Sequence, residues 1–223
     1  MQNICGNHLP VKRVFDSIVF DLDGTLWDTC PSCAIAWNNV LERNGIQFRP
    51  ITADDVRVVT GKPHETCIRE TFLGLSEDLI QLIFTQTIEE DNRVVREKGG
   101  ELYPAVRNEL PRLARRYPLF IVSNCQAGYI ETFIDWTGFN LLFKDFECWG
   151  NTGKSKTDNL RSLVLRNGLQ KPLMVGDAEG DQKAAKDCGI PFAFVQYGFG
   201  KCQNPDYSYQ SFNDLVSAFA DEF

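Results

Sequence analysis

Short runs of consecutive apolar residues, each ended by polar residues, recur along the chain. Three of them read SIVF before Asp21, LFIV before Ser123 and LMV before Gly176. A strand that is buried on both faces of a parallel sheet is apolar at every position, so these runs predict central parallel strands. The full set of expected strands covers residues 17–20, 119–122, 146–149, 173–175 and 192–195.

Amphipathic helical patterns follow the later strands, at residues 129–136, 159–166 and 182–187. Strands that alternate with helices predict an α/β fold with a doubly wound, Rossmann-like parallel sheet. A further helix is expected over residues 105–116, and Pro111 should kink or shorten it. In open parallel sheets the ligand binds beyond the carboxyl ends of the strands. The polar residues at those ends are therefore candidates for a functional site.

The stretch between the first two expected strands is too long for a single crossover. Its pattern lacks a clear strand and predicts four helices, over residues 34–43, 52–59, 64–72 and 77–97. Glycines and prolines separate these segments, as expected for helix boundaries. The sequence thus predicts a small α-helical cap domain, residues 29–102, inserted after the first strand. The predicted core domain consists of residues 1–28 and 103–223.

Composition and charge exclude several classes of protein but do not identify a ligand. The 223 residues are 43% hydrophobic and 24% charged, which is ordinary for a globular protein. A net charge of −7 argues against a nucleic-acid partner. No run approaches the ~18 apolar residues of a membrane span, and the first residues show no secretion signal. The eight cysteines have no disulfide-framework spacing, so we expect a cytoplasmic protein with reduced thiols.

Two carboxylates follow the first expected strand in the sequence FDLDGT. Asp21 and Asp23 are separated by one residue, so an extended chain directs both to the same face. Carboxylates this close repel each other unless a cation or a shared proton stabilises them. Mg²⁺ prefers such oxygen ligands and retains positions for a phosphate. Gly24 then permits a tight turn, and Thr25 supplies a hydroxyl and a backbone N–H for binding that phosphate.

Two later segments carry groups that suit a phosphoryl ligand. Ser123 and Asn124 directly follow an expected strand, where a hydroxyl and an open backbone can donate to a phosphoryl oxygen. Lys154 and Lys156 precede a helix, and a lysine there can neutralise a phosphate or hold a carboxylate ionised. We favour Lys156 because it is closer to the start of the helix.

The last segment is GDAEGD, after the run LMV. Asp177 is placed there as a metal ligand, and Asp181 as a second ligand or as an anchor that orients the first. The order of the four segments, strand-DxDGT, strand-Ser, Lys before a helix and strand-GDxxxD, resembles the signature of the haloacid dehalogenase-like superfamily. The resemblance covers residues 15–28 and 103–200.

The helical insertion resembles the cap of the phosphoglycolate phosphatase-like and β-phosphoglucomutase-like branch. The resemblance implies a Mg²⁺-dependent phosphatase of a small phosphorylated metabolite, with phosphoglycolate-like compounds as first candidates. Asp21 would be the nucleophile that forms an aspartyl-phosphate, and Asp23 the general acid and base. The Asp21 carboxylate, the Asp23 backbone carbonyl and Asp177 would hold Mg²⁺. Ser123 and Lys156 would bind the transferring phosphoryl group.

Asp23 also separates reactions within the superfamily. A halide leaving group needs no acid, and the dehalogenases proper lack an aspartate at this position, so Asp23 favours phosphoryl chemistry. Three alternatives remain open: a phosphomutase, a phosphonatase with a Schiff base on Lys62, and a non-catalytic binding module on the same fold. Degenerate members are expected to lose a motif carboxylate, and this chain has lost none.

The sequence assigns no role to several polar residues of the predicted cap. These residues are Arg57, Lys62, His64 and Arg69. Cys30 and Cys33 have the C-x-x-C spacing of redox pairs, and a thiol at a helix start can have a lowered pKa. The surrounding sequence is not thioredoxin-like, which argues against redox chemistry.

Overall fold

Six parallel strands form a central sheet in residues 14–220, the part of the chain that this computed structural model describes. Their order across the sheet is β5 (Phe143–Cys148), β4 (Leu119–Ser123), β1 (Ser17–Phe20), β6 (Pro172–Gly176), β7 (Phe192–Val195) and β8 (Tyr207–Tyr209). Each neighbouring pair is parallel. The predicted α/β fold with a parallel sheet is confirmed.

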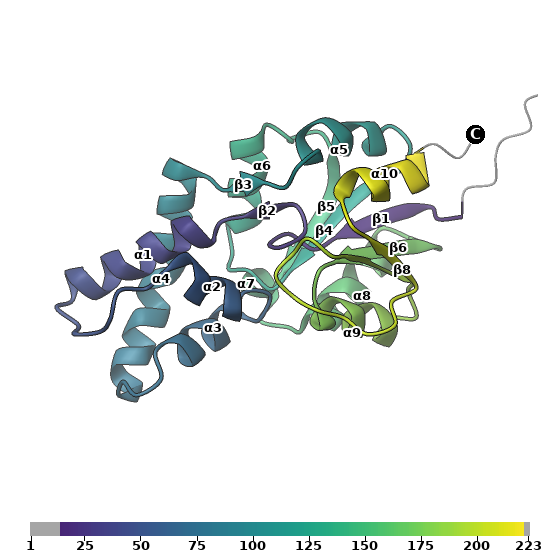
Figure 1. The fold of residues 1–223 in the computed structure, drawn as a ribbon. Coiled ribbons are helices and arrows are strands. Elements are labelled where there is room, and N and C mark those ends of the chain that lie inside the picture. Colours follow the sequence, from purple (N-terminus) through teal and green to yellow (C-terminus); the bar gives the residue numbers. More distant parts are fainter. Residues whose placement is uncertain (1–13, 221–223) are drawn as a thin grey trace, which may run out of the picture.

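Helices cover both faces of the sheet (Figure 1). Along β1, Ile18 and Phe20 pack into one buried cluster, whereas Val19 belongs to another on the opposite face. The first cluster includes apolar residues of α5 (Val106–Ala114), α6 (Tyr129–Thr137) and α10 (Phe212–Ala220). The second includes residues of α8 (Lys156–Arg166) and α9 (Glu179–Asp187). This two-sided burial explains why the central strands are apolar at every position.

The helical segment leaves and re-enters the core through a short antiparallel pair of strands, β2 (Trp27–Asp28) and β3 (Glu101–Leu102). Between them lie α1 (Cys30–Arg43), α2 (Ala53–Val59), α3 (His64–Thr71) and α4 (Glu77–Lys98), which lie apart from the sheet in Figure 1. The cap expected after the first strand is therefore present. The domain boundaries after residues 28 and 102 remain a prediction, and residues 1–13 and 221–223 of the proposed core lie outside the described part.

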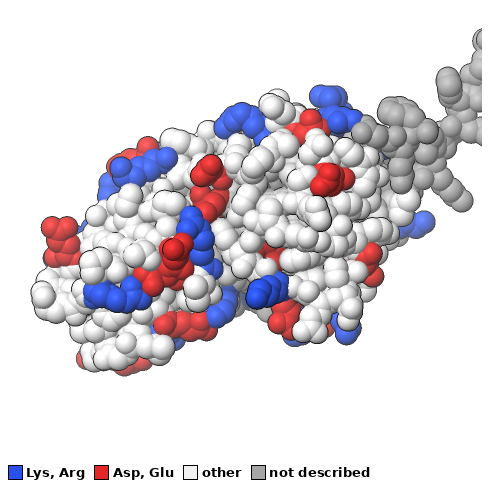
Figure 2. Space-filling model, viewed as in Figure 1, with Lys and Arg blue, Asp and Glu red and all other residues white. Residues whose placement is uncertain are grey.

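Charged side chains are interspersed on the face shown in Figure 2, where blue and red atoms alternate over both parts of the molecule. The outline narrows between the cap helices and the core, and a cavity lined by residues of both parts lies at this junction. Within residues 14–220, no helix combines the length and apolar character needed to cross a membrane.

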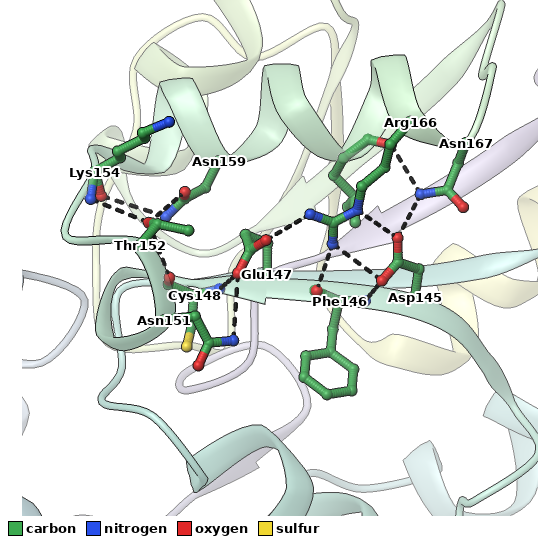
Figure 3. A network of polar contacts seen from close by, with 11 residues as sticks. Asp145, Phe146, Glu147, Cys148, Asn151, Thr152, Lys154, Asn159, Arg166 and Asn167 are labelled. Carbon is green, nitrogen blue, oxygen red and sulfur yellow. Dashed lines mark hydrogen bonds and ion pairs between the residues drawn. The ribbon is translucent and has the colours of Figure 1, made fainter.

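The edge strand β5 differs from the prediction. It ends at Cys148, and Trp149 begins the short helix α7 (Trp149–Thr152), so the expected strand at 146–149 was wrong at both ends. The strand begins at Phe143, and the charged residues Lys144 and Asp145 interrupt the apolar pattern from which its start was predicted. Arg166 of α8 reaches across to this strand (Figure 3), with Nε 2.7 Å from an oxygen of Asp145 and Nη2 2.7 Å from the carbonyl of Phe146. Charges and a covering side chain protect the edge from pairing with another chain.

Further differences concern short strands and the ends of helices, including α1, which begins at Cys30 rather than at residue 34. The sequence did not predict β2, β3 or β8, because runs of two or three residues carry no periodicity. Helix α5 covers Val106–Ala114, less than the expected 105–116, and contains Pro111. Helices α8 and α9 begin three residues earlier than expected.

Burial in the sheet predicts which leucines carry stability. We expect Leu173→Ala, at a fully buried position of β6, to lower the free energy of unfolding by about 2–5 kcal/mol, because it leaves a cavity. Leu165→Ala, at a 74% exposed position of α8, should change it by less than about 0.5 kcal/mol. Denaturant unfolding of the two variants measures this, and equal losses would contradict the packing described here.

Candidate active site

The predicted site residues meet at the carboxyl edge of the sheet. Strand β1 lies between β4 and β6, so Asp21 follows the central strand, Ser123 ends one neighbour and Asp177 follows the other. The backbone N–H of Asp21 donates to the carbonyl oxygen of Val175 at 2.8 Å, which continues the sheet pairing into the site. Strands β4 and β5 lie on one side of β1, and β6 to β8 lie on the other. In open parallel sheets, ligands bind at the carboxyl edge where the strand order changes direction in this way.

Lys156, rather than Lys154, contacts Asp21. Its Nζ donates to an oxygen of Asp21 and to an oxygen of Asp181, each at 2.6 Å. All three side chains are 6% exposed or less, whereas Lys154 is exposed. Burial opposes charge on Lys156, but the carboxylates of Asp181 and Asp21 outweigh it and raise the pKa of the ammonium. Lys156 is therefore a fixed positive charge beside the predicted nucleophile.

The loop before Lys156 is held by a ring of hydrogen bonds, which Figure 3 shows around Asn159. The Thr152 hydroxyl donates to Oδ1 of Asn159 at 2.7 Å, and Nδ2 of Asn159 donates to the carbonyl of Lys154 at 3.3 Å. The backbone N–H of Lys154 donates back to the Thr152 hydroxyl at 3.1 Å. Asn159 is fully buried, so it fixes the path of the chain into α8.

Three buried carboxylates form a cluster that suits a cation. One oxygen each of Asp21, Asp177 and Asp181 lies within 4.8 Å of the others. Burial, and then the charge of Asp181, raise the pKa of Asp21 well above its usual range and the pKa of Asp177 to about 7. A single lysine cannot balance three carboxylates. Hard oxygen donors at these separations fit a divalent cation, which would stabilise their ionised forms.

Asp177 is held in place by the backbone around it. Its Oδ2 accepts the backbone N–H groups of Phe199 at 2.7 Å and Gly200 at 3.1 Å. Gly24 has φ +83°, and a Cβ there would lie 2.4 Å from the same oxygen, so only glycine fits. The buried hydroxyl of Thr25 donates to Asp177 at 3.5 Å. The structure thus places Thr25 against the predicted metal ligand.

Asp181 has the contacts of an anchor. Its Oδ2 accepts the backbone N–H groups of Asp177 at 3.2 Å and Ala178 at 3.1 Å, while its other oxygen binds Lys156. This carboxylate therefore fixes both the turn after β6 and the lysine of α8. Its oxygens also make it a possible third ligand of the cluster.

Asp23 is hydrogen-bonded to two hydroxyl groups. Its Oδ1 accepts from Tyr129 at 2.7 Å and from Thr29 at 3.2 Å, and these two hydroxyls also contact each other. Burial raises the pKa of Asp23 to about 6. A carboxyl group with such a pKa can both give and take a proton near neutral pH. Neither Tyr129 nor Thr29 belonged to the predicted site.

A small cavity of about 60 Å³ connects this site to the cap. Asp21, Asp23 and Ser123 line it from the core, and His64 and Asp91 from the cap. The cap closes over it, because Nδ2 of Asn124, a predicted phosphate-binding residue, donates to the carbonyl of Gly61 at 2.8 Å. This volume is far below that of a drug-sized pocket, which favours a small ligand.

The cationic residues of the cap are engaged elsewhere. Arg57 binds Asp28 at 2.8 and 3.0 Å, and Arg69 binds Glu65 and Glu77 at the surface. Lys62 lines the cavity, but its ammonium is paired with Glu70.

The C-x-x-C pair does not have the features of a redox centre. Cys30 and Cys33 are both free thiols and both buried, and burial raises the pKa of each. Reactive cysteines need a lowered pKa.

Comparison with known proteins identifies the family. A sequence model described as haloacid dehalogenase-like hydrolase matches residues 18–195. The chain belongs to this family. Among curated haloacid dehalogenase-like hydrolases, the phosphoglycolate phosphatase of Synechococcus elongatus is 30% identical over 215 residues, which cover 91% of this chain and 96% of that protein. The phosphoglycolate phosphatase of Vibrio parahaemolyticus is 26% identical over 220 residues, 91% and 95% of the two chains.

Two solved structures have the same fold. One from Haemophilus somnus, named a predicted phosphoglycolate phosphatase, has a TM-score of 0.82 at 22% identity and covers 93% of this chain and 99% of its own. CbbY from Rhodobacter sphaeroides, in complex with phosphate, has a TM-score of 0.75 at 17% identity and covers 90% and 96%. This hydrolase therefore lies in the phosphoglycolate phosphatase-like branch.

The acidic cluster predicts stabilisation by a divalent cation. Saturation at about 100 times the dissociation constant should add about 2.7 kcal/mol, or roughly 5–10 °C in Tm, because binding relieves the repulsion among the carboxylates. Asp177→Asn removes one cluster carboxylate and should abolish most of this shift, whereas Asp187→Asn, at an exposed position of α9, should retain it. Thermal unfolding with and without Mg²⁺ or Mn²⁺ measures the effect, and an unchanged wild-type Tm would contradict a metal site.

Proposed function

We propose that this chain is a Mg²⁺-dependent phosphatase that hydrolyses a small phosphorylated metabolite through an aspartyl-phosphate on Asp21. The observation that carries this proposal is the pairing of a buried Asp21 with Lys156 beside Asp177, where Asp21 lines a small cavity between the core and the cap. A nucleophilic carboxylate must be ionised and must approach an anionic phosphate, and the fixed ammonium of Lys156 favours both.

In the first step, a carboxylate oxygen of Asp21 attacks phosphorus, and the bond to the leaving alcohol oxygen breaks. Lys156 and the hydroxyl of Ser123 lie at the sheet edge where they can stabilise the equatorial oxygens of the transferring group. The Asp21 and Asp177 carboxylates, with the Asp23 backbone carbonyl, would hold Mg²⁺. When bound, this ion supplies positive charge between the nucleophile and the phosphate.

Asp23 would move the protons. In its protonated form it gives a proton to the leaving alcohol, and as a carboxylate it then takes one from the water that hydrolyses the aspartyl-phosphate. Burial, which raises its pKa to about 6, supports this double use. Tyr129 and Thr29 both donate to the same oxygen of Asp23, Oδ1, and Asp23 lines the cavity.

Several features support a small substrate and a cytoplasmic setting. The cavity is small, the net charge of −7 disfavours a polyanionic partner, and the cysteines of residues 14–220 are free. The relatives' names suggest phosphoglycolate as the first compound to assay. A phosphonatase would need a free amine at Lys62, and the pairing of that ammonium with Glu70 gives this alternative no support.

The nucleophile is tested by substitution. We expect Asp21→Asn to lower kcat on any accepted phosphate ester by about a thousandfold or more, since the amide cannot form the acyl-phosphate bond. The wild type, rapidly quenched during turnover with Mg²⁺, should carry one phosphoryl group on Asp21, detected by peptide mass spectrometry. Activity of Asp21→Asn equal to that of the wild type would rule out the proposed mechanism.

The two lysines of the loop provide a matched pair. Lys156→Gln should lower kcat by about 100-fold or more, because it removes the charge next to Asp21 and the transferring phosphoryl group. Lys154→Gln removes an exposed charge two residues away and should remain within about twofold of the wild type. Rates are compared below the Tm of both variants. A larger loss of kcat in Lys154→Gln than in Lys156→Gln would assign the phosphate-binding role to Lys154.

A further inference from the structure

A buried tyrosine of the core is hydrogen-bonded to the predicted general acid and base. Tyr129 is the first residue of α6, and its hydroxyl lies 2.7 Å from Oδ1 of Asp23, 106 positions away in the chain. A carboxylate has only acceptors, so the tyrosine is the donor when Asp23 is ionised. A hydrogen bond to an ionised group is stronger than one between neutral groups, above all where water is excluded. This contact therefore restrains the carboxylate.

Aromatic packing fixes the ring of Tyr129. Its centroid lies 5.6 Å from that of Trp27 with the planes at 64°, and Trp27 packs edge-to-face on Phe133 at 4.9 Å. All three side chains are buried. Contacts of this kind stabilise a defined ring orientation. The ring accounts for the packing, whereas only the hydroxyl reaches Asp23, so a phenylalanine would fill the same space without the hydrogen bond.

The second donor to Asp23 comes from a different part of the chain. Thr29 lies between β2 and α1, where the chain enters the cap, and its hydroxyl is 3.2 Å from Oδ1. It also contacts the hydroxyl of Tyr129, and all three residues line the cavity. Within residues 14–220, the Asp23 carboxyl group makes no other hydrogen bond. Without the hydroxyl of Tyr129, the longer bond from Thr29 would be its remaining restraint.

We propose that Tyr129 is the positioning residue of the general acid, and that its hydroxyl holds Oδ1 of Asp23 while the proton moves through Oδ2. As the bond between phosphorus and the leaving oxygen breaks, the proton on Oδ2 passes to that oxygen. In the second step Oδ2 takes a proton from the attacking water. Tyr129 donates a hydrogen bond throughout and transfers no proton. This inference rests on the proposed phosphatase activity and adds a residue to it.

The role predicts a dependence on the leaving group. An alkoxide must take a proton as it departs, whereas acetate leaves acetyl phosphate as a stable anion and needs none. A general acid acts only at hydrogen-bond distance from the oxygen that it protonates, and a small displacement from that geometry is costly. A misplaced Asp23 should therefore slow the attack on alkyl phosphates but not the attack on acetyl phosphate.

Two matched variants isolate the hydroxyl. Tyr129→Phe removes it and keeps the ring. Tyr117→Phe removes another buried tyrosine hydroxyl, which donates to the carbonyl of Phe219 at 3.3 Å. Tyr117 precedes β4, whereas the site lies beyond the other end of that strand. The Tm of each variant confirms folding, and rates are compared below both values.

The substrates are ethyl phosphate, phosphoglycolate and acetyl phosphate, each assayed with Mg²⁺ and the full chain. The parameter compared is kcat/KM, which reports the steps up to departure of the leaving group. For the alkyl ester that the wild type hydrolyses faster, Tyr129→Phe should lower kcat/KM by about tenfold or more. For acetyl phosphate it should stay within about twofold, and Tyr117→Phe should stay within about twofold on every compound.

A double variant tests whether Tyr129 acts through Asp23. In an Asp23→Asn background the acid is already lost, so adding Tyr129→Phe should change kcat/KM for the alkyl ester by less than about twofold. This comparison does not depend on acetyl phosphate. A tyrosine needed only for packing would cost as much in this background as in the wild type.

The outcomes separate the two proposals. Equal losses on alkyl and acetyl phosphates, a gain in activity, or a full loss in the Asp23→Asn background would overturn the positioning role while the phosphatase activity stands. If the wild type hydrolyses neither alkyl ester faster than Asp21→Asn does, the proposed function fails, and the inference fails with it. A loss confined to alkyl esters and absent without Asp23 would support both.

Discussion

The site depends on one buried ammonium group that is shared by two carboxylates. Lys156 lies between Asp21 and Asp181 at 2.6 Å from each, and it connects β1, α8 and α9 at the carboxyl edge of the sheet. Removing charges from water is costly, and only good geometry and further hydrogen bonds offset that cost. Here Asp181 accepts two backbone N–H groups as well, so the same carboxylate fixes the turn after β6 and orients the lysine. The position of the predicted nucleophile therefore follows from contacts among three separate elements.

This arrangement leaves a surplus of negative charge, and the surplus explains the kind of ligand that the site suits. Lys156 can balance only one of the three carboxylates, and burial raises the pKa of Asp21 and of Asp177. A divalent cation would restore the balance, after which the site can receive a dianionic phosphate. The backbone donors at Phe199 and Gly200, with Gly24 in close contact, hold Asp177 where such a cation needs it. The repulsion among the buried carboxylates lowers the stability of the fold, whereas the same carboxylates make the site suitable for a cation. Such a trade-off is common at sites that are preorganised for a charged ligand.

Much of the core could be predicted because the chemistry lies next to the strands that position it. Asp21, Ser123 and Asp177 each end or follow an apolar run, and parallel strands bring such residues to one edge. Tyr129 could not be predicted in this way, since it comes from a helix 106 residues from Asp23 and no local pattern connects the two. The phosphate-binding role expected for Thr25 remains a prediction, and its fully buried hydroxyl contacts Asp177, a direction that sequence spacing does not give. The start of β5 was missed for another physical reason, because an edge strand carries charges that a central strand does not.

The cap differs from the core in how its cavity residues are positioned, and this difference limits what membership of the family says about the substrate. In the proposed reaction the core motifs would bind the phosphoryl group, which is common to every phosphate ester, and the cavity extends from them to side chains of three cap helices. Trp37, His64 and Asp91 come from α1, α3 and α4, and their hydrogen bonds are set by packing within the cap. Identity near 30% over the whole chain is compatible with an unchanged reaction centre and a different leaving-group site. The proposed reaction therefore rests on residues of the core, whereas the choice of substrate depends on side chains that the cap contributes to the cavity.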